Sequence, residues 1–110
     1  MAKTYAQVVG VVLILIGIVG FFVSTLLGAT TTTLHNLIHL VSGAWGAYAG
    51  FMGGLGGPKS YAQIFGVIYT LVAILGFIGV LGGIIPVNTT YNLIHLVIGV
   101  LGLYVGFMGG

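Results

Sequence analysis

The chain consists of two similar halves. Residues 3–54 align with residues 59–110 without a gap, so that each residue of the first half has a counterpart 56 positions later. The segment Asn36-Leu-Ile-His-Leu-Val, for example, returns as Asn92-Leu-Ile-His-Leu-Val. Duplication of a shorter sequence is the simplest account. The repeat predicts that both halves adopt the same supersecondary unit and pack against each other.

Charged side chains are nearly missing. Among 110 residues there are two lysines and no aspartate or glutamate, and 59% of the residues are hydrophobic. A water-soluble domain carries about 25% charged residues, and a charged side chain in mid-membrane costs about 2.5 to 3.5 kcal/mol. The chain is therefore predicted to be an integral membrane protein. The absence of cysteine excludes disulfides, thiolate nucleophiles and iron–sulfur sites, and a formal charge of +2 is too small for nucleic-acid binding.

Each half contains two apolar stretches of spanning length, since about 20 helical residues cross a hydrocarbon core of about 30 Å. We predict four transmembrane helices near residues 5–27, 34–53, 60–82 and 91–109. Glycine or proline occurs in each connection between them and disfavours a continuous helix. The predicted fold is a single all-α membrane domain, residues 1–110, built as two tandem helical hairpins with parallel topology.

The two lysines predict the orientation. Lys3 and Lys59 precede the first and the third predicted helix, which places them on the same membrane face. Because positive residues favour the cytoplasmic side, both termini are expected there. Each half has two helices, so the halves insert in the same direction and a two-fold axis along the membrane normal is expected to relate them.

The second and fourth predicted helices carry a polar stripe of small residues. At 100° per residue their Asn, His and Gly positions fall within roughly 80° of the helix surface. The stripe contains Asn36, His39, Gly43, Gly46 and Gly50, and in the second half Asn92, His95, Gly99, Gly102 and Gly106. In one interpretation it is structural, because small residues bring helices together in lipid and buried Asn and His hydrogen bonds then clamp the bundle.

The same stripe supports a cofactor hypothesis. An ionisable residue inside the membrane is a candidate functional residue, and a neutral imidazole ligates the metal of a tetrapyrrole. His39 and His95 are thus candidate axial ligands of haem b or of a chlorophyll or bacteriochlorophyll. Asn36, Asn92, Gly43 and Gly99 are the expected supporting face, with the glycines leaving room for a macrocycle. The absence of any cofactor is an equally open interpretation.

His35 precedes His39 by four residues, a spacing that is able to chelate a metal. Its counterpart in the second half is Tyr91, and no Asp, Glu or Cys is present to complete a tetrahedral site. We therefore expect His35 to be an interfacial residue and expect no metal site other than a tetrapyrrole metal at His39 and His95. Trp45, Tyr48 and Tyr104 are expected to face lipid or the membrane interface.

The chain has few side chains suited to catalysis. Acid–base chemistry usually pairs groups of different pKa, and this chain has no carboxylate to orient or balance its histidines and tyrosines. We expect no enzymatic activity. A small channel or permease is a further alternative, although four helices so rich in glycine are expected to pack shut.

The segment Leu34-His35-Asn36-Leu37-Ile38-His39-Leu40 with Gly43, and its echo Asn92-Leu93-Ile94-His95-Leu96 with Gly99, carry a family resemblance. Over essentially its whole length the chain resembles an uncharacterised family of bacterial four-helix membrane proteins, domain of unknown function 4383. The resemblance implies the four-helix architecture and no particular activity. Members of that family often have more charged tails and loops, so this chain's bare surface favours enclosure by partners.

These observations combine into a functional expectation. We expect an accessory or structural subunit of a larger membrane complex, photosynthetic or electron-transferring, in a bacterial inner or photosynthetic membrane. Its expected partners are the lipid bilayer and other membrane subunits.

Overall fold

The computed structural model describes residues 1–26, 29–54, 56–79 and 88–109. The elements in chain order are α1 (Ala2–Gly20), β1 (Thr25–Leu26), β2 (Ala29–Thr30), α2 (Thr33–Ala47), η1 (Tyr48–Met52), α3 (Gly57–Phe77), α4 (Thr89–Leu103) and η2 (Tyr104–Met108). The strands form one short antiparallel ribbon after α1. The segments η1 and η2 are π-helical continuations of α2 and α4. The predicted all-helical class is confirmed for the described residues apart from this ribbon.

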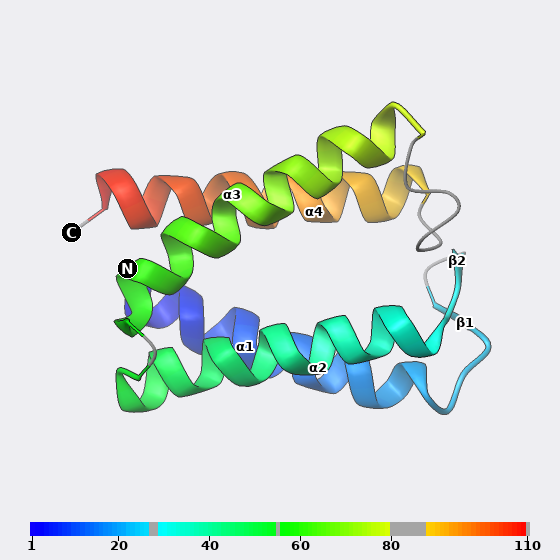
Figure 1. Cartoon of the computed structure of the whole chain (residues 1–110), viewed down its shortest axis with the longest axis horizontal. Helices are drawn as coiled ribbons and strands as arrows, with labels where there is room; N and C mark the ends of the chain where they lie inside the picture. Colours follow the sequence, from blue (N-terminus) through cyan, green and yellow to red (C-terminus); the bar gives the residue numbers. More distant parts are fainter. Residues whose placement is uncertain (27–28, 55, 80–87, 110) are drawn as a thin grey trace.

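The helices form two antiparallel pairs. The first pair is α1 with α2 and η1, the second is α3 with α4 and η2, and α3 also packs on α1 (Figure 1). Both marked chain ends and the connection before α3 lie at one end of the bundle, and the β-ribbon lies at the other (Figure 1). The molecule measures 37 × 29 × 17 Å, so its long axis is comparable with the thickness of a bilayer.

The second and fourth helices begin at matching side-chain caps. The Thr32 hydroxyl accepts a hydrogen bond from the backbone N–H of His35, and Oδ1 of Asn88 accepts one from the N–H of Tyr91. The two capping residues are 56 positions apart, and each satisfies an N–H group that has no partner within the helix. The two helices therefore start at equivalent residues.

The first helix is shorter than predicted. It ends at Gly20 and not near residue 27, because Phe21 and Phe22 form i→i−3 turns onto Ile18 and Val19. The residues that follow are rich in β-branched side chains and pair as strands. Apolarity alone does not distinguish such a segment from the end of a helix.

The third helix also differs at both ends. It starts at Gly57, three residues before the predicted start, because Pro58 is well suited to the first turn of a helix. It ends at Phe77, followed by Gly79 with φ of 84°. The predicted end near residue 82 lies outside the described residues. The second and fourth helical segments, residues 33–52 and 89–108, lie within two residues of their predicted bounds.

Three helical segments are long and apolar enough to cross a membrane, namely Ala2–Gly20, Gly57–Phe77 and Thr89–Met108. This is consistent with an integral membrane protein. Within the described residues, the second helical segment does not meet the same criteria. It carries His35, Ser42 and Trp45 where its counterpart has Tyr91, Ile98 and Leu101, which lowers its hydropathy.

Backbones meet closely within each pair. A Cβ atom on Gly10 of α1 would lie 2.7 Å from the carbonyl carbon of Gly46, and one on Gly66 of α3 would lie 2.6 Å from the backbone nitrogen of Leu103. No side chain fits at such distances. The contacts are what small residues provide between helices in lipid. Each pair is closed further by a glutamine, since Gln7 donates to the Gly50 carbonyl at 2.9 Å and Gln63 to the Gly106 carbonyl at 2.7 Å.

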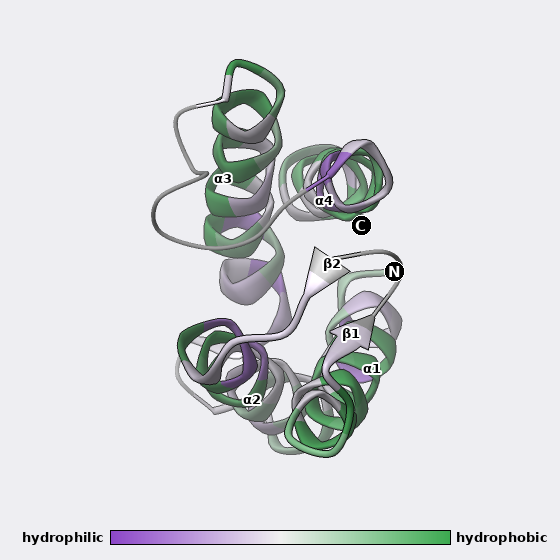
Figure 2. Cartoon of the chain, turned by 90° about the vertical axis from the view of Figure 1, so that its right-hand side faces the viewer, coloured by the Kyte–Doolittle hydropathy of each residue, from purple (hydrophilic) through white to green (hydrophobic). Residues whose placement is uncertain are grey.

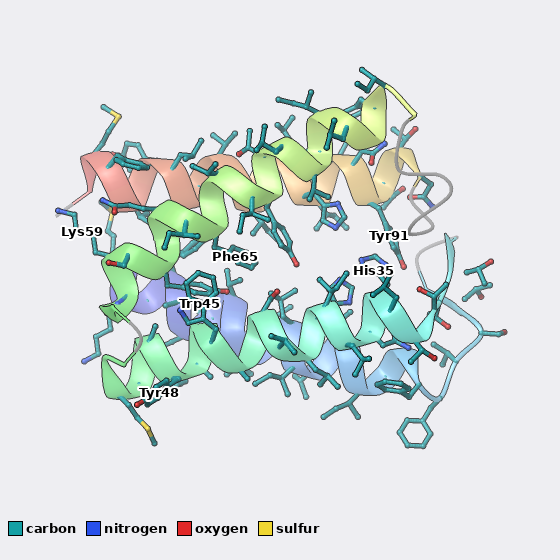
Figure 3. The ribbon with its side chains drawn as sticks, viewed as in Figure 1. His35, Trp45, Tyr48, Lys59, Phe65 and Tyr91 are labelled. Carbon is teal, nitrogen blue, oxygen red and sulfur yellow. The ribbon has the colours of Figure 1, made fainter. Side chains whose placement is uncertain are left out.

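An aromatic row fills the interface between the two pairs. The rings of Trp45 and Tyr61 meet edge to face at 4.7 Å, and Phe65 lies between Tyr61 and Tyr69 at 4.8 and 4.0 Å. Tyr61 and Phe65 are almost fully buried. Trp45 therefore does not face lipid as expected but points toward α3, whereas Tyr48 is directed outward (Figure 3).

Candidate functional site

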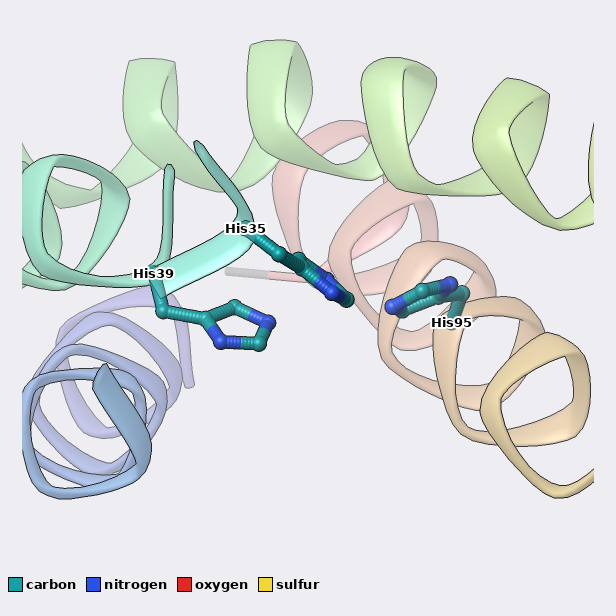
Figure 4. Close-up of side chains that lie close together, drawn as sticks. All are labelled: His35, His39 and His95. Carbon is teal, nitrogen blue, oxygen red and sulfur yellow. The ribbon is translucent and has the colours of Figure 1, made fainter. Parts of the chain in front are cut away.

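Three histidines converge between the two helix pairs. His35 and His39 extend from α2 and His95 from α4 (Figure 4). One ring nitrogen of each lies within 4.8 Å of the corresponding nitrogens of the other two. Only 5%, 8% and 5% of their respective surfaces is exposed. Among the described residues this is the one group of three or more His, Cys, Asp or Glu residues with metal-binding spacing.

The local sequence explains how the cluster forms. The Thr32 cap starts α2 so that His35 falls in its first turn and His39 one turn later on the same face, with ring centroids 4.2 Å apart. His95 stands six residues after the first residue of α4, as His39 does in α2. Matching depth in the two helices brings His95 against the pair from α2.

Tyrosine rings enclose the cluster. Tyr91 meets His35 at 5.8 Å and His95 at 6.2 Å between ring centroids, and Tyr69 of α3 meets His95 edge to face at 5.2 Å. His35 and Tyr91, which are sequence counterparts, face each other across the space between α2 and α4 (Figure 3). Each helix of the second pair thus contributes an aromatic wall to the histidines.

Two of the imidazoles carry a buried nitrogen without a hydrogen-bond partner. These are Nδ1 of His39 and Nδ1 of His95. A buried polar atom that lacks a partner costs about 1 to 3 kcal/mol. Ligation is one chemical way to satisfy such a nitrogen, because a neutral imidazole offers a lone pair to a metal.

An apolar cavity of about 240 Å³ adjoins the cluster. His39, Tyr69, Tyr91 and His95 form one part of its wall. Aliphatic side chains of α1 and α4 form the rest, namely Val8, Val9, Val12, Leu13, Ile16, Ile94 and Ile98. His39 and His95 therefore border a space that favours apolar ligands over polar ones.

The predicted supporting residues lie elsewhere. A Cβ on Gly43 would lie 2.7 Å from the Gly10 carbonyl oxygen, and one on Gly99 would lie 2.5 Å from the backbone nitrogen of Thr70. The space beside both glycines is thus filled by the neighbouring helix of the same pair, and they leave no room for a macrocycle. The prediction that they do is wrong, because a helical face of small residues attracts another backbone.

Asn36 and Asn92 also belong to the contacts within each pair. The amide of Asn36 lies against Gly20 of α1, and the amide of Asn92 lies against Gly76 of α3. Oδ1 of Asn92 has no hydrogen-bond partner. The contacts of both amides are with the neighbouring helix of the same pair. They share the helical stripe with the histidines but point toward a different neighbour.

The sequence predicts only an interfacial position for His35. Its spacing of four residues from His39 was the available signal, but its replacement by Tyr91 in the second half argued against a role. The structure buries it with the other two histidines. A difference between the two repeats at one position does not exclude a site there. A residue at the interface of the two halves lies beside side chains from both.

A family model covers nearly all of the chain, from residue 3 to residue 108. The chain belongs to the family described as domain of unknown function 4383. No curated protein and no solved structure matches it significantly. The resemblance inferred from the His-Asn segments is confirmed. Since the description of family 4383 names no activity, the function of this member has to be argued from its own site.

The chemistry open to this member of family 4383 is limited by its donors. Three imidazoles supply neutral nitrogen ligands, and the whole chain has no carboxylate or thiol. Such a set suits late first-row transition metals and the iron or magnesium of a tetrapyrrole, and is unsuited to calcium or free magnesium ions, which require oxygen ligands.

Proposed function

We propose that this chain is a small, non-enzymatic integral membrane protein that holds a metal-containing cofactor between its two helical hairpins, as an accessory subunit of a larger membrane assembly. The proposal rests on the convergence of His35, His39 and His95. All three are buried, and one ring nitrogen of each lies within 4.8 Å of the others. Ionisable side chains inside a membrane are rare and expensive, so three together call for a compensating interaction.

The form of the cofactor suggested by the repeat is a tetrapyrrole, haem b or a chlorophyll, ligated by His39 and His95. The apolar cavity of about 240 Å³ bordered by both residues supports this candidate, since the edge of a macrocycle is itself apolar. In a photosynthetic or electron-transfer assembly, such a subunit would position its cofactor while other subunits perform the chemistry.

The membrane arrangement is part of the proposal. All four helical segments cross the bilayer as two tandem hairpins related by a two-fold axis along its normal, with both termini cytoplasmic. Equivalent hydrogen bonds support this: Tyr5 donates to the Ile98 carbonyl at 2.7 Å, and Tyr61 donates to the Ser42 carbonyl at 3.3 Å. The two donors are 56 positions apart in the sequence, and so are the two acceptors. Lys3 and Lys59 favour the cytoplasmic placement.

Partner subunits account for much of the outer surface. Figure 2 shows hydrophobic residues along the helices, and large side chains are widely exposed. The most exposed are Phe22 at 84%, Met108 at 78%, Met52 at 77%, Val41 at 69% and Ile78 at 65%. Met52 and Met108 are sequence counterparts. Lipid covers such a surface in part, and membrane subunits pack on it in the proposed assembly.

The two alternatives have weaker support. In the clamp alternative, Asn and His hydrogen bonds hold the helices together, yet Nδ1 of His39, Nδ1 of His95 and Oδ1 of Asn92 have no hydrogen-bond partner. In the channel alternative, solutes pass through the bundle, yet Tyr61 and Phe65 fill the interface between the pairs. The channel alternative makes no use of the histidines, and the clamp alternative leaves these buried atoms unsatisfied.

Purification in a mild detergent tests the proposal. The expected result is a complex heavier than the single chain that contains a stoichiometric metal or pigment, measured by elemental mass spectrometry and solvent extraction. His39→Leu and His95→Leu should lose the cofactor. Trp45→Leu, which introduces the residue of the second half at the same interface, should retain it. A colourless, metal-free monomer would contradict both the cofactor and the partner parts of the proposal.

A further inference from the structure

We propose that the cofactor is a single monovalent copper ion bound by His35, His39 and His95. This inference rests on the proposed function, because it names the cofactor that the buried histidines hold. It departs from the tetrapyrrole candidate by giving His35 a ligand role equal to that of the other two residues.

The spacing of the donors suits one small ion. Three nitrogens at about 2.0 to 2.1 Å from a common metal lie about 3.3 to 3.6 Å from one another. In the structure the three ring nitrogens lie within 4.8 Å of one another. The imidazoles therefore need to approach by little more than an ångström, a distance that rotation of their side chains supplies while the helices stay in place.

The position of His35 opposes a tetrapyrrole shared by the other two histidines. A macrocycle ligated by His39 and His95 would extend several ångströms from its metal in every direction of the plane between them. The ring of His35 lies between the rings of His39 and His95 in Figure 4, 4.2 Å from the first and 6.2 Å from the second. A macrocycle placed between His39 and His95 would therefore have to displace the ring of His35.

The donor type narrows the choice of ion. All three ligands are neutral imidazoles, which suit zinc, copper, iron and nickel. Of these metals, copper has a stable monovalent state that accepts three nitrogen ligands in a plane, a number that this cluster provides without help from any further side chain.

Charge balance favours the monovalent state. The chain contains no aspartate or glutamate, and valine, leucine, isoleucine and tyrosine side chains line the cavity beside His39 and His95. The cost of moving an ion from water into an apolar interior grows with the square of its charge, so a monovalent ion pays about a quarter of the cost of a divalent ion of equal size. A site with only neutral ligands therefore selects the lower charge.

Anaerobic titration of the purified protein in detergent micelles tests the inference. The probe is monovalent copper in the presence of a chromogenic competing chelator, with divalent zinc and haem b as comparison probes. The expected result is one copper bound per chain, more tightly than zinc. His35→Tyr, which introduces the residue of the second half, should weaken copper binding at least tenfold, as should His39→Leu and His95→Leu. Trp45→Leu should bind copper like the native chain.

X-ray absorption of the copper-loaded native protein measures the number and distance of the copper ligands without any variant. Three imidazole nitrogens at about 2.0 Å are expected. Tighter binding of zinc, fewer than three imidazoles at copper, or haem binding that His35→Tyr leaves intact would overturn the copper inference while the proposed cofactor function stands. Failure of all three probes to bind, together with a solvent extract of the purified protein that contains no chlorophyll, would overturn both.

Discussion

The hydroxyl of Tyr5 in α1 donates a hydrogen bond to the backbone carbonyl of Ile98 in α4, 2.7 Å away, and so ties the first residues of one hairpin to the middle of the other. The counterpart bond, from Tyr61 to Ser42, measures 3.3 Å. These bonds lie on the same interface as the histidine cluster. The Tyr5 bond joins α1 to α4 and the Tyr61 bond joins α3 to α2, so both tie one hairpin to the other.

Removal of these hydroxyls should loosen that interface. Tyr5→Phe is expected to lower the free energy of unfolding by about 1 kcal/mol, because the partly buried carbonyl of Ile98 then loses its additional donor. Tyr61→Phe should cost less, since its bond is longer. Thermal unfolding in detergent, followed by circular dichroism, measures both. Equal or larger destabilisation by Tyr61→Phe would contradict the ranking that the two distances predict.

The glycine contacts within each pair predict a strong effect of added volume. Gly66→Val should destabilise the α3–α4 pair by about 1 to 3 kcal/mol, because a Cβ there would meet the backbone of Leu103 at 2.6 Å. Gly10→Val should act similarly on the α1–α2 pair. Val11→Ala, at a position that is 42% exposed, is the matched control and should change stability by less than about 0.5 kcal/mol. Helicity and unfolding temperature in detergent report the difference.

A buried hydroxyl offers a stabilising substitution. Oγ1 of Thr70 is buried without a hydrogen-bond partner, and the first half has Ile14 at the equivalent position. Thr70→Val keeps the shape and removes the unsatisfied oxygen, so it should raise stability by about 0.5 to 1 kcal/mol. A lower unfolding temperature for this variant would show that the hydroxyl has an interaction that the structure does not contain.

A fourth imidazole should strengthen metal binding. Tyr91→His places the ligand of the first half at the equivalent position of the second, where the ring of Tyr91 is 5.8 Å from His35 and 6.2 Å from His95. Zinc affinity is expected to rise at least tenfold, because zinc prefers four ligands in a tetrahedron. Competition titration with a zinc-binding dye measures the change. Unchanged zinc affinity would place position 91 outside the metal's reach.

The depth of His39 and His95 could be predicted from the sequence because the repeat fixes equivalent positions in equivalent helices. The role of Gly43 and Gly99 could not, since a helical stripe shows which residues share a face and not which neighbour covers it. Within each pair, these glycines and asparagines pack against the neighbouring helix. His95, which belongs to the same stripe, instead lies against His35 of the other pair.

The end of α1 and the position of His35 also escaped prediction for physical reasons. A segment of apolar, β-branched residues satisfies the composition of a membrane helix even where the chain turns and pairs as strands. His35 differs from its counterpart, and comparison of the two halves therefore reduced its weight. Its contact with His95 arises only from the approach of α2 to α4, which depends on tertiary packing.

The facing positions of His35 and Tyr91 have a consequence for how such a site arises. Two identical hairpins assembled around a two-fold axis supply every donor in duplicate, so a homodimer offers two or four imidazoles and never three. Covalent linkage of the halves allows one facing position to be histidine while the other is tyrosine. Three donors at the interface of two similar halves can therefore arise in a linked chain but not in a symmetric dimer of one half.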